Sequence, residues 1–141
     1  MRITHSKVWP RIVILGVVYF VVGYGSSLLD HSFSAQIHFW RIAAWVVAAA
    51  IYIGHLTYEQ FSLANPPLTT STHVGIAAAI GGFLLAVAAT AHAAIVLEHA
   101  SYARHLIAWI AWPLLTGVPA FLVSFVLTLG LRWLKIPRAA A

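Results

Sequence analysis

The side chains of this chain that are able to do chemistry are few, and most of them are histidines. The sequence has eight histidines, no cysteine and three acidic residues, which are Asp30, Glu59 and Glu98. Neutral imidazole binds iron, copper and zinc, so this composition directs attention to a metal or a haem. The absence of cysteine excludes disulfides, thiolate catalysis, cysteine-ligated zinc and iron–sulfur clusters.

The spacing of the histidines does not match a metal motif. The zinc-protease pattern His-Glu-x-x-His is absent, and Glu98-His99 is separated from His105 by too long a gap. A haem with two histidine ligands needs two imidazoles at one depth on facing helices, and His38 with His92 is the pair that comes closest. These two histidines are therefore the candidate ligands for a haem b, and no other metal site is expected.

Hydrolytic and phosphate chemistry have little support in the sequence. There is no Gly-x-Ser-x-Gly elbow for a serine nucleophile. The run Gly23-Tyr24-Gly25 lacks the third glycine and the lysine of a phosphate-binding loop. The three carboxylates lie at the ends of different segments, so a paired general acid and base has no candidates. We therefore do not expect an enzyme.

Four long apolar segments must position these residues. They cover residues 12–29, 39–58, 74–97 and 106–131. Each has about the length that a helix needs to cross a hydrocarbon core ~30 Å thick at ~1.5 Å per residue. Only 8% of the residues are charged and 62% are hydrophobic, against about 25% charged in soluble domains. The sequence predicts an all-α integral membrane protein, a four-helix antiparallel transmembrane bundle in one domain of residues 1–141, in contact with the lipid bilayer.

The basic residues predict the orientation of this bundle. Four crossings place both termini on one side of the membrane, together with Arg2, Lys7, Arg11, Arg132, Lys135 and Arg138. The other side holds Arg41 and Arg104. Because positive residues are retained on the cytoplasmic side, both termini are expected in the cytoplasm, and the membrane is expected to be a bacterial cytoplasmic (inner) membrane. The basic residues flank segment ends without forming a dense run, so no nucleic-acid partner is expected.

The first segment has a second interpretation. Arg2, Lys7 and Arg11 precede an apolar run, as in a secretory signal peptide, and cleavage would leave three helices. The run contains Tyr19 and Tyr24 and has no convincing small-x-small cleavage site. This pattern favours a retained helix.

The third segment is built largely from glycine and alanine, including Gly75, Ala78 and Gly82. Small residues spaced four apart let helix backbones approach closely in lipid, so this helix is expected to be central. The second segment carries Ala44 and Ala48, and only a short connection separates the two segments. We therefore expect the second and third segments to pack as an antiparallel hairpin.

That hairpin would bring ionisable side chains together in the outer half of the membrane. Equal depth pairs Arg41 with His92 and His38 with Glu98, and the same arithmetic places Tyr52 near Gly82. An ionisable residue in a membrane helix costs ~2.5 to 3.5 kcal/mol at the bilayer centre and usually faces protein or water. The four ionisable residues are thus hypothesised to form either a ligand or cofactor site or a structural contact between helices.

The fourth segment contains Pro113 and Pro119. Each proline removes a backbone donor and clashes with the preceding turn, so a bend is expected. A bend would open a cavity beside Trp112, Thr116 and Tyr24, suited to a quinone, a lipid head group or a small anion, which makes Trp112 a further candidate site residue.

The connection between the second and third segments lies at the inner end. His55 and Glu59, one helical turn apart, are expected to form a local surface pair there. The run Thr69 to Thr72 is expected to cap the third helix.

Three functions are open for such a chain. The leading hypothesis is a small non-enzymatic membrane protein, a subunit or accessory that packs as a homo-oligomer or in a larger membrane complex. It is motivated by the small-residue surfaces and the scarcity of catalytic residues. The second is a redox subunit that binds haem b or a quinone in the outer half of the bundle. The third is permeation of small ions or protons.

Overall fold

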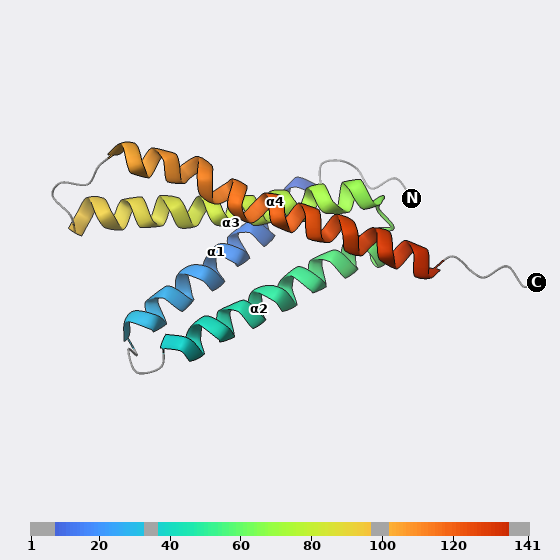
Figure 1. The fold of residues 1–141 in the computed structure, drawn as a ribbon, viewed down its shortest axis with the longest axis horizontal. Coiled ribbons are helices and arrows are strands. Elements are labelled where there is room, and N and C mark those ends of the chain that lie inside the picture. The colour runs from blue at the N-terminus through green and yellow to red at the C-terminus, as the bar shows by residue number, and fades with distance from the viewer. Residues whose placement is uncertain (1–7, 33–36, 97–101, 136–141) are drawn as a thin grey trace, which may run out of the picture.

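The computed structural model describes residues 8–32, 37–96 and 102–135, and these residues form helices joined by short connections (Figure 1). The elements are α1 (Val8–Ser32), α2 (Ile37–Thr57), the short π-helix η3 (Tyr58–Ser62), α3 (Pro67–Val96) and α4 (Tyr102–Lys135). Among the described residues, four helices are long and apolar enough to cross a membrane. The prediction of an all-α, four-helix, multi-pass membrane fold is confirmed.

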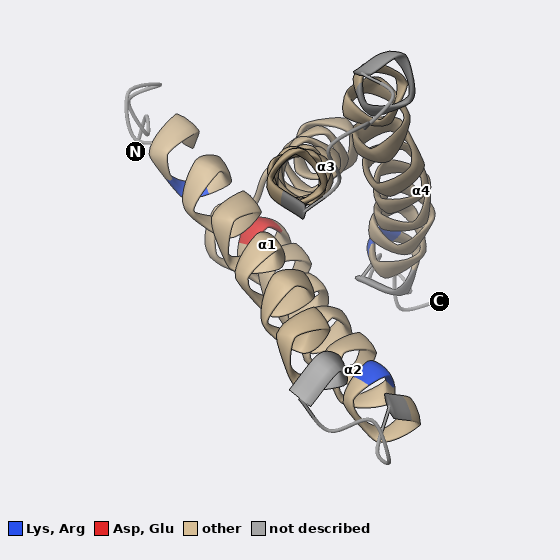
Figure 2. Ribbon diagram, turned by 90° about the vertical axis from the view of Figure 1, so that its left-hand side faces the viewer, with Lys and Arg blue, Asp and Glu red and all other residues tan. Residues whose placement is uncertain are grey.

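The four helices form two hairpins, α1 with α2 and α3 with α4, arranged like a V. The hairpins meet at the end where α1 begins, α4 ends and α2 connects to α3, and they diverge toward the opposite end (Figure 1). Figure 2, which looks at that opposite end, shows α1 and α2 separated from α3 and α4. We call the two ends the terminal end and the open end.

Helix α3 is central, as its composition predicts. It packs most extensively on α4 and next on α1. Glycines permit both contacts. On the α1 side, a Cβ atom at Gly81 of α3 would lie 2.8 Å from Cβ of Tyr19 on α1. On the α4 side, a Cβ atom at Gly117 would lie 2.9 Å from Cβ of Ala79. These approaches are closer than side chains allow, so the absence of a side chain is what brings the backbones together.

The predicted hairpin of the second and third helices is wrong. Helix α2 lies against α1, and its contacts with α3 are few (Figure 1). Tyr52 was expected beside Gly82, but its hydroxyl donates a hydrogen bond of 2.9 Å to the backbone carbonyl of Ala120 on α4. Gly82 lies instead against Thr116 and the backbone of Trp112 on α4.

Steric fit explains why α3 packs on α1 and α4 and not on α2. Helix α1 presents Gly16 to Ile80 and Ala77 of α3, and α4 presents Gly117 to Gly75 and Ala79 of α3. The corresponding stripe of α2 carries the bulky side chains of Trp45 and Tyr52. In lipid, helix association depends on van der Waals packing, so the two smoother surfaces pack on α3 and α2 is left at the edge.

Helix α3 begins earlier than predicted. Its first residue is Pro67, and proline suits this position because its missing N–H is not needed in the first turn. The hydroxyl of Ser71 donates to the carbonyl of Pro67 at 2.7 Å, and that of Thr72 donates to the carbonyl of Leu68 at 2.8 Å. The run Thr69 to Thr72 therefore lies inside the helix, and the prediction that it caps the helix is wrong.

Helix α4 continues through Pro113 and Pro119 as one helix. Between them, the Thr116 hydroxyl donates to the carbonyl of Trp112 at 2.9 Å and lies 3.1 Å from the carbonyl of Ala78 on α3. Hydroxyl groups of this kind help membrane helices to tolerate proline. The bend expected at the two prolines stays a prediction.

Candidate functional site

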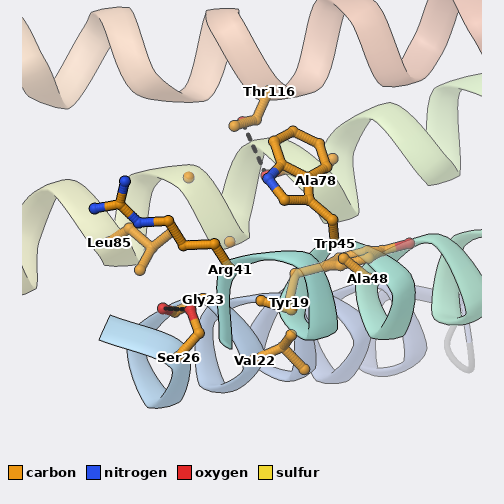
Figure 3. A pocket seen from close by; sticks show the side chains of 13 residues that line it. Tyr19, Val22, Gly23, Ser26, Arg41, Trp45, Ala48, Ala78, Leu85 and Thr116 are labelled. Carbon is orange, nitrogen blue, oxygen red and sulfur yellow. Dashed lines mark hydrogen bonds between the residues drawn. The ribbon is translucent and has the colours of Figure 1, made fainter. Parts of the chain in front are cut away.

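The divergence of the two hairpins leaves a cavity of about 320 Å³ between them. All four long helices line it, and most of the lining is alanine, glycine or aliphatic side chain. Helix α3 contributes Ala78, Gly81, Gly82 and Leu85, and α2 contributes Arg41, Ala44, Trp45 and Ala48. We call this space the central cavity (Figure 3).

Two long side chains of α2 reach into the central cavity toward α3. Figure 3 shows Arg41 extending toward the region of Leu85, and the indole of Trp45 pointing toward Ala78 and Thr116. Trp45 is nevertheless 78% exposed, so the side chains around it do not fill the space. The small-residue face of α3 and the aromatic and basic face of α2 do lie opposite each other, but a gap separates them.

The hydroxyl groups of the central cavity differ in how they are satisfied. Ser26 donates to the carbonyl of Gly23 at 2.8 Å, and Thr116 donates to backbone carbonyls of α3 and α4. The Tyr19 hydroxyl is buried and has no hydrogen-bond partner among the described residues. It points away from Arg41 (Figure 3). The guanidinium of Arg41 and the hydroxyl of Tyr19 therefore lie at opposite ends of the apolar wall.

A second cavity of about 390 Å³ lies closer to the open end, and we call it the outer cavity. It shares Leu85 with the central cavity. Tyr24 on α1, His92 on α3 and Trp112 on α4 line it together. The cavity predicted beside Trp112 and Tyr24 is therefore present, whereas Thr116, predicted in the same place, lines the central cavity.

The predicted polar cluster is divided between these two spaces. Arg41 lines the central cavity and His92 the outer one. His38 is exposed at the start of α2 and lines neither. Glu98 lies outside the described residues. The structure thus brings His92 beside Trp112, and it places Arg41 next to Trp45 instead.

The same geometry bears on the haem hypothesis. Helices α2 and α3 diverge toward the open end, where the start of α2 and the end of α3 lie (Figure 1). His38 and His92 therefore do not face each other across a packed helix pair, which a haem with two histidine ligands requires. Within residues 8–32, 37–96 and 102–135, no group of three or more His, Cys, Asp or Glu side chains is placed to hold a metal ion.

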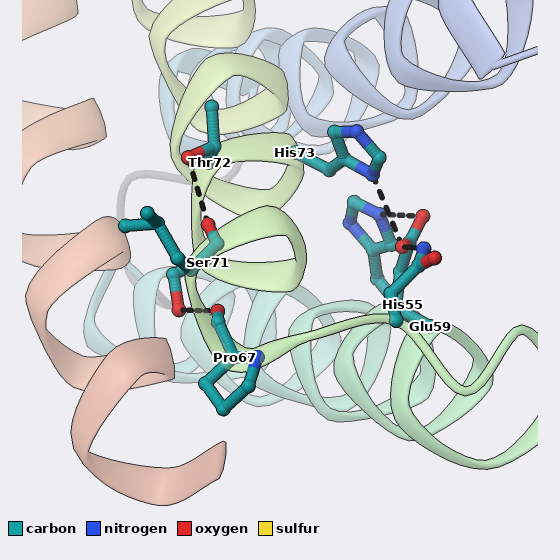
Figure 4. A network of polar contacts seen from close by, with 8 residues as sticks. His55, Glu59, Pro67, Ser71, Thr72 and His73 are labelled. Carbon is teal, nitrogen blue, oxygen red and sulfur yellow. Dashed lines mark hydrogen bonds and ion pairs between the residues drawn. The ribbon is translucent and has the colours of Figure 1, made fainter. Parts of the chain in front are cut away.

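At the terminal end, a buried network surrounds Glu59, and the sequence predicted it only in part (Figure 4). One carboxylate oxygen, Oε2, accepts hydrogen bonds from the side-chain amide of Asn65 and from Nδ1 of His73, the latter at 3.0 Å. The other oxygen lies 3.8 Å from Nε2 of His55. The pair of His55 and Glu59 is present as expected, but the prediction that it lies on the surface is wrong, because the two residues are 5% and 4% exposed.

The π-helix η3 and the turn after it bring Asn65 to Glu59. After Thr57 the backbone widens into η3, and the N–H of Leu63 donates to the carbonyl of Tyr58 at 3.2 Å. The chain then turns at Ala64, whose φ of 51° lies in the left-handed region, and the N–H of Asn65 returns to the carbonyl of Glu59 at 3.2 Å. Glu59 lies one helical turn after His55, on the same buried face. A histidine in the first turns of α3 was the signal for this network that sequence reasoning missed.

Basic residues of α1 and α4 contact the segment that carries this network. The guanidinium of Arg11 on α1 lies 6.0 Å from the ring centroid of Tyr58, within the range of a cation–π interaction. On α4, Nη2 of Arg132 lies 3.5 Å from the carbonyl oxygen of Asn65. The terminal end is therefore closed and polar, and the open end holds two largely apolar cavities.

Comparisons with protein-family models, with characterised proteins and with solved structures found no match to this chain. An apolar space between membrane helices, with one guanidinium at its edge, is suited to holding a molecule that has an apolar body and a polar end.

Proposed function

We propose that this protein is a non-enzymatic membrane component that binds an amphiphilic molecule of the bilayer between its two hairpins. The observation that carries the proposal is Trp45, which points across the central cavity toward α3 and α4 and is still 78% exposed. The apolar walls of the cavity are too far apart to make dispersion contacts with each other, so in a bilayer this space suits a lipid-phase molecule or a helix of another chain.

The dimensions of the cavities support a small molecule. Binding pockets for such ligands occupy about 300 to 1,000 Å³ and combine an apolar lining with a few polar groups. The central and outer cavities, of about 320 and 390 Å³, meet at Leu85. Together they offer room for a ring or an alkyl chain with a polar end, so a quinone and a membrane lipid both fall within this proposal.

The role of subunit or accessory is compatible with this activity and stays a prediction, as does association into a homo-oligomer or a larger membrane complex. A partner helix is the competing occupant of the central cavity. Permeation of ions or protons receives no support from the central cavity, because its wall between Arg41 and Tyr19 is apolar.

The test is to extract the protein under mild conditions and analyse what stays bound after extensive washing. Mass spectrometry and an absorption spectrum are expected to show about one amphiphile per monomer, and a reduced haem band would identify the competing cofactor. A dimer without such a molecule, or a clean monomer, would contradict the proposal.

A matched pair of variants locates the site. Ala48 lines the central cavity, whereas Ala50 is exposed on the same helix and is not part of the lining. Ala48→Leu is expected to displace the bound molecule because the added atoms occupy its space. Ala50→Leu adds the same atoms elsewhere on α2 and is expected to leave retention unchanged. Equal retention by both variants would place the molecule outside this cavity.

A further inference from the structure

We infer that the occupant of the central cavity is an anionic phospholipid, held with its phosphate on Arg41 and one acyl chain along the small-residue wall of α3. This inference rests on the proposed function and names the chemical class of the ligand. It is carried by the position of one cation, by the direction of its side chain and by the shape of the wall beyond it.

The depth of Arg41 matches a lipid head group. Arg41 lies four residues after Ile37, the first residue of α2, which corresponds to about 6 Å along the helix axis. The candidate membrane span begins at His38, so Arg41 lies about 4.5 Å inside it, and its long side chain can reach the level of the phosphates. A phosphate is therefore within reach of the guanidinium while the chain attached to it enters the apolar region.

The direction of Arg41 is inward, toward the space between the hairpins. Its side chain extends from α2 toward α3 and the region of Leu85, where the central and outer cavities meet (Figure 3). A guanidinium carries five N–H donors in a planar fork that matches two oxygens of a phosphate. It can therefore bind a phosphate in addition to contacts within the chain. None of the described residues that line the two cavities carries a carboxylate that would repel an anion.

The wall beyond Arg41 suits an alkyl chain. On one side it is formed by Ala78 and Gly81 of α3, and on the other by Ala48 and Trp45 of α2. These side chains offer a long, smooth apolar surface and few hydrogen-bond donors. A quinone would need donors for its two carbonyl groups, but the hydroxyls of Ser26 and Thr116 already donate to backbone carbonyls.

An arginine near a helix end can also reach the head groups of the surrounding lipid without holding any one molecule. A lipid held by the protein differs from the surrounding lipid in two measurable ways: the protein prefers one lipid class, and it retains a fixed number of lipids per chain. We therefore propose native mass spectrometry of the full chain, delipidated in detergent and then incubated with equal amounts of phosphatidylglycerol and phosphatidylcholine.

The expected result is one retained phosphatidylglycerol per chain, preferred about tenfold over phosphatidylcholine, as a charge-assisted contact with a phosphate allows. Arg41→Gln is expected to reduce this preference to about twofold, and Arg41→Lys to keep most of it, which also shows that a variant at this position folds. Arg132→Gln is the matched control, since it removes one positive charge at the terminal end, where Arg132 contacts Asn65.

The outcomes distinguish this inference from the proposed function. Equal retention of the two lipids, or an unchanged preference in Arg41→Gln, overturns the anionic phospholipid and leaves a bound amphiphile in place. A quinone carried through purification has the same consequence. If no amphiphile of any kind is retained, both the inference and the proposed function fail.

Discussion

Replacing Glu59 by alanine should destabilise the protein more than any other single change at the terminal end. The carboxylate is 4% exposed and accepts hydrogen bonds from Asn65 and His73. A hydrogen bond to a charged group contributes about 1.5 to 3 kcal/mol. Removing one partner of a buried, charged network costs about 3 to 5 kcal/mol, because the remaining groups are left buried and unpaired. We expect a loss near the lower end, about 3 kcal/mol, since His73 is partly exposed and can turn to water.

Thermal unfolding in detergent, followed by circular dichroism, measures this loss. For a chain of this size, about 3 kcal/mol corresponds to a decrease of roughly 10 °C in Tm. Glu59→Gln keeps the volume and one acceptor oxygen and should show about half of the decrease. Ser62→Ala is the control, because Ser62 is exposed in the same short helix η3.

The reasoning would be refuted if Glu59→Ala unfolded within about 1 °C of Ser62→Ala. That result would mean that the network forms around Glu59 without stabilising the fold. The connection between α2 and α3 would then be held by the backbone hydrogen bonds of η3 and Asn65 alone.

Two further predictions concern how the helices pack, and both are measured by the same unfolding experiment. Gly81→Leu should destabilise the protein by about 1 to 3 kcal/mol, because its Cβ atom would lie 2.8 Å from Cβ of Tyr19. The control Gly130→Leu should be neutral, because an added Cβ there meets nothing within 4 Å. Equal stability of the two variants would disprove the close approach of α1 and α3. Tyr52→Phe should lower the free energy of unfolding by about 0.6 kcal/mol, and at most by about 1.7 kcal/mol, because it removes the hydrogen bond from α2 to the carbonyl of Ala120 on α4. A variant as stable as the parent protein would show that this bond does not stabilise the position of α2.

The membrane helices were predictable because the bilayer imposes their length and composition. Helices α1 and α4 contain the predicted segments 12–29 and 106–131 and extend beyond them at both ends, whereas α2 and α3 begin earlier than predicted and end at Thr57 and Val96. Helix pairing was not predictable in the same way. Glycine and alanine occur on several helices, and the choice between them depends on the shape of both partners. The bulk of Trp45 and Tyr52 excluded α2 from close packing on α3, although chain connectivity favoured it.

Depth in the membrane predicted only part of the lining of the outer cavity. Tyr24, His92 and Trp112 line the outer cavity, whereas Thr116 and Arg41, which were expected at the same depth, line the central cavity. The predicted partnership of Arg41 with His92 required α2 and α3 to be adjacent, so it failed along with the hairpin. Burial of Glu59 was missed because a carboxylate near a helix end usually reaches water. The side chains that contact it, Asn65 and His73, come from the turn after η3 and from α3, and their approach has no clear pattern in the sequence.

The central claim is that α2 stands apart from α3 and that a membrane molecule occupies the space between them. A structure of the protein in nanodiscs of native lipid tests this claim most directly. We expect α3 in contact with α1 and α4, and an elongated non-protein density bordered by Arg41, Trp45 and Gly82. Closure of α2 onto α3, with Ala48 against Ala78 and no density between them, would contradict the account.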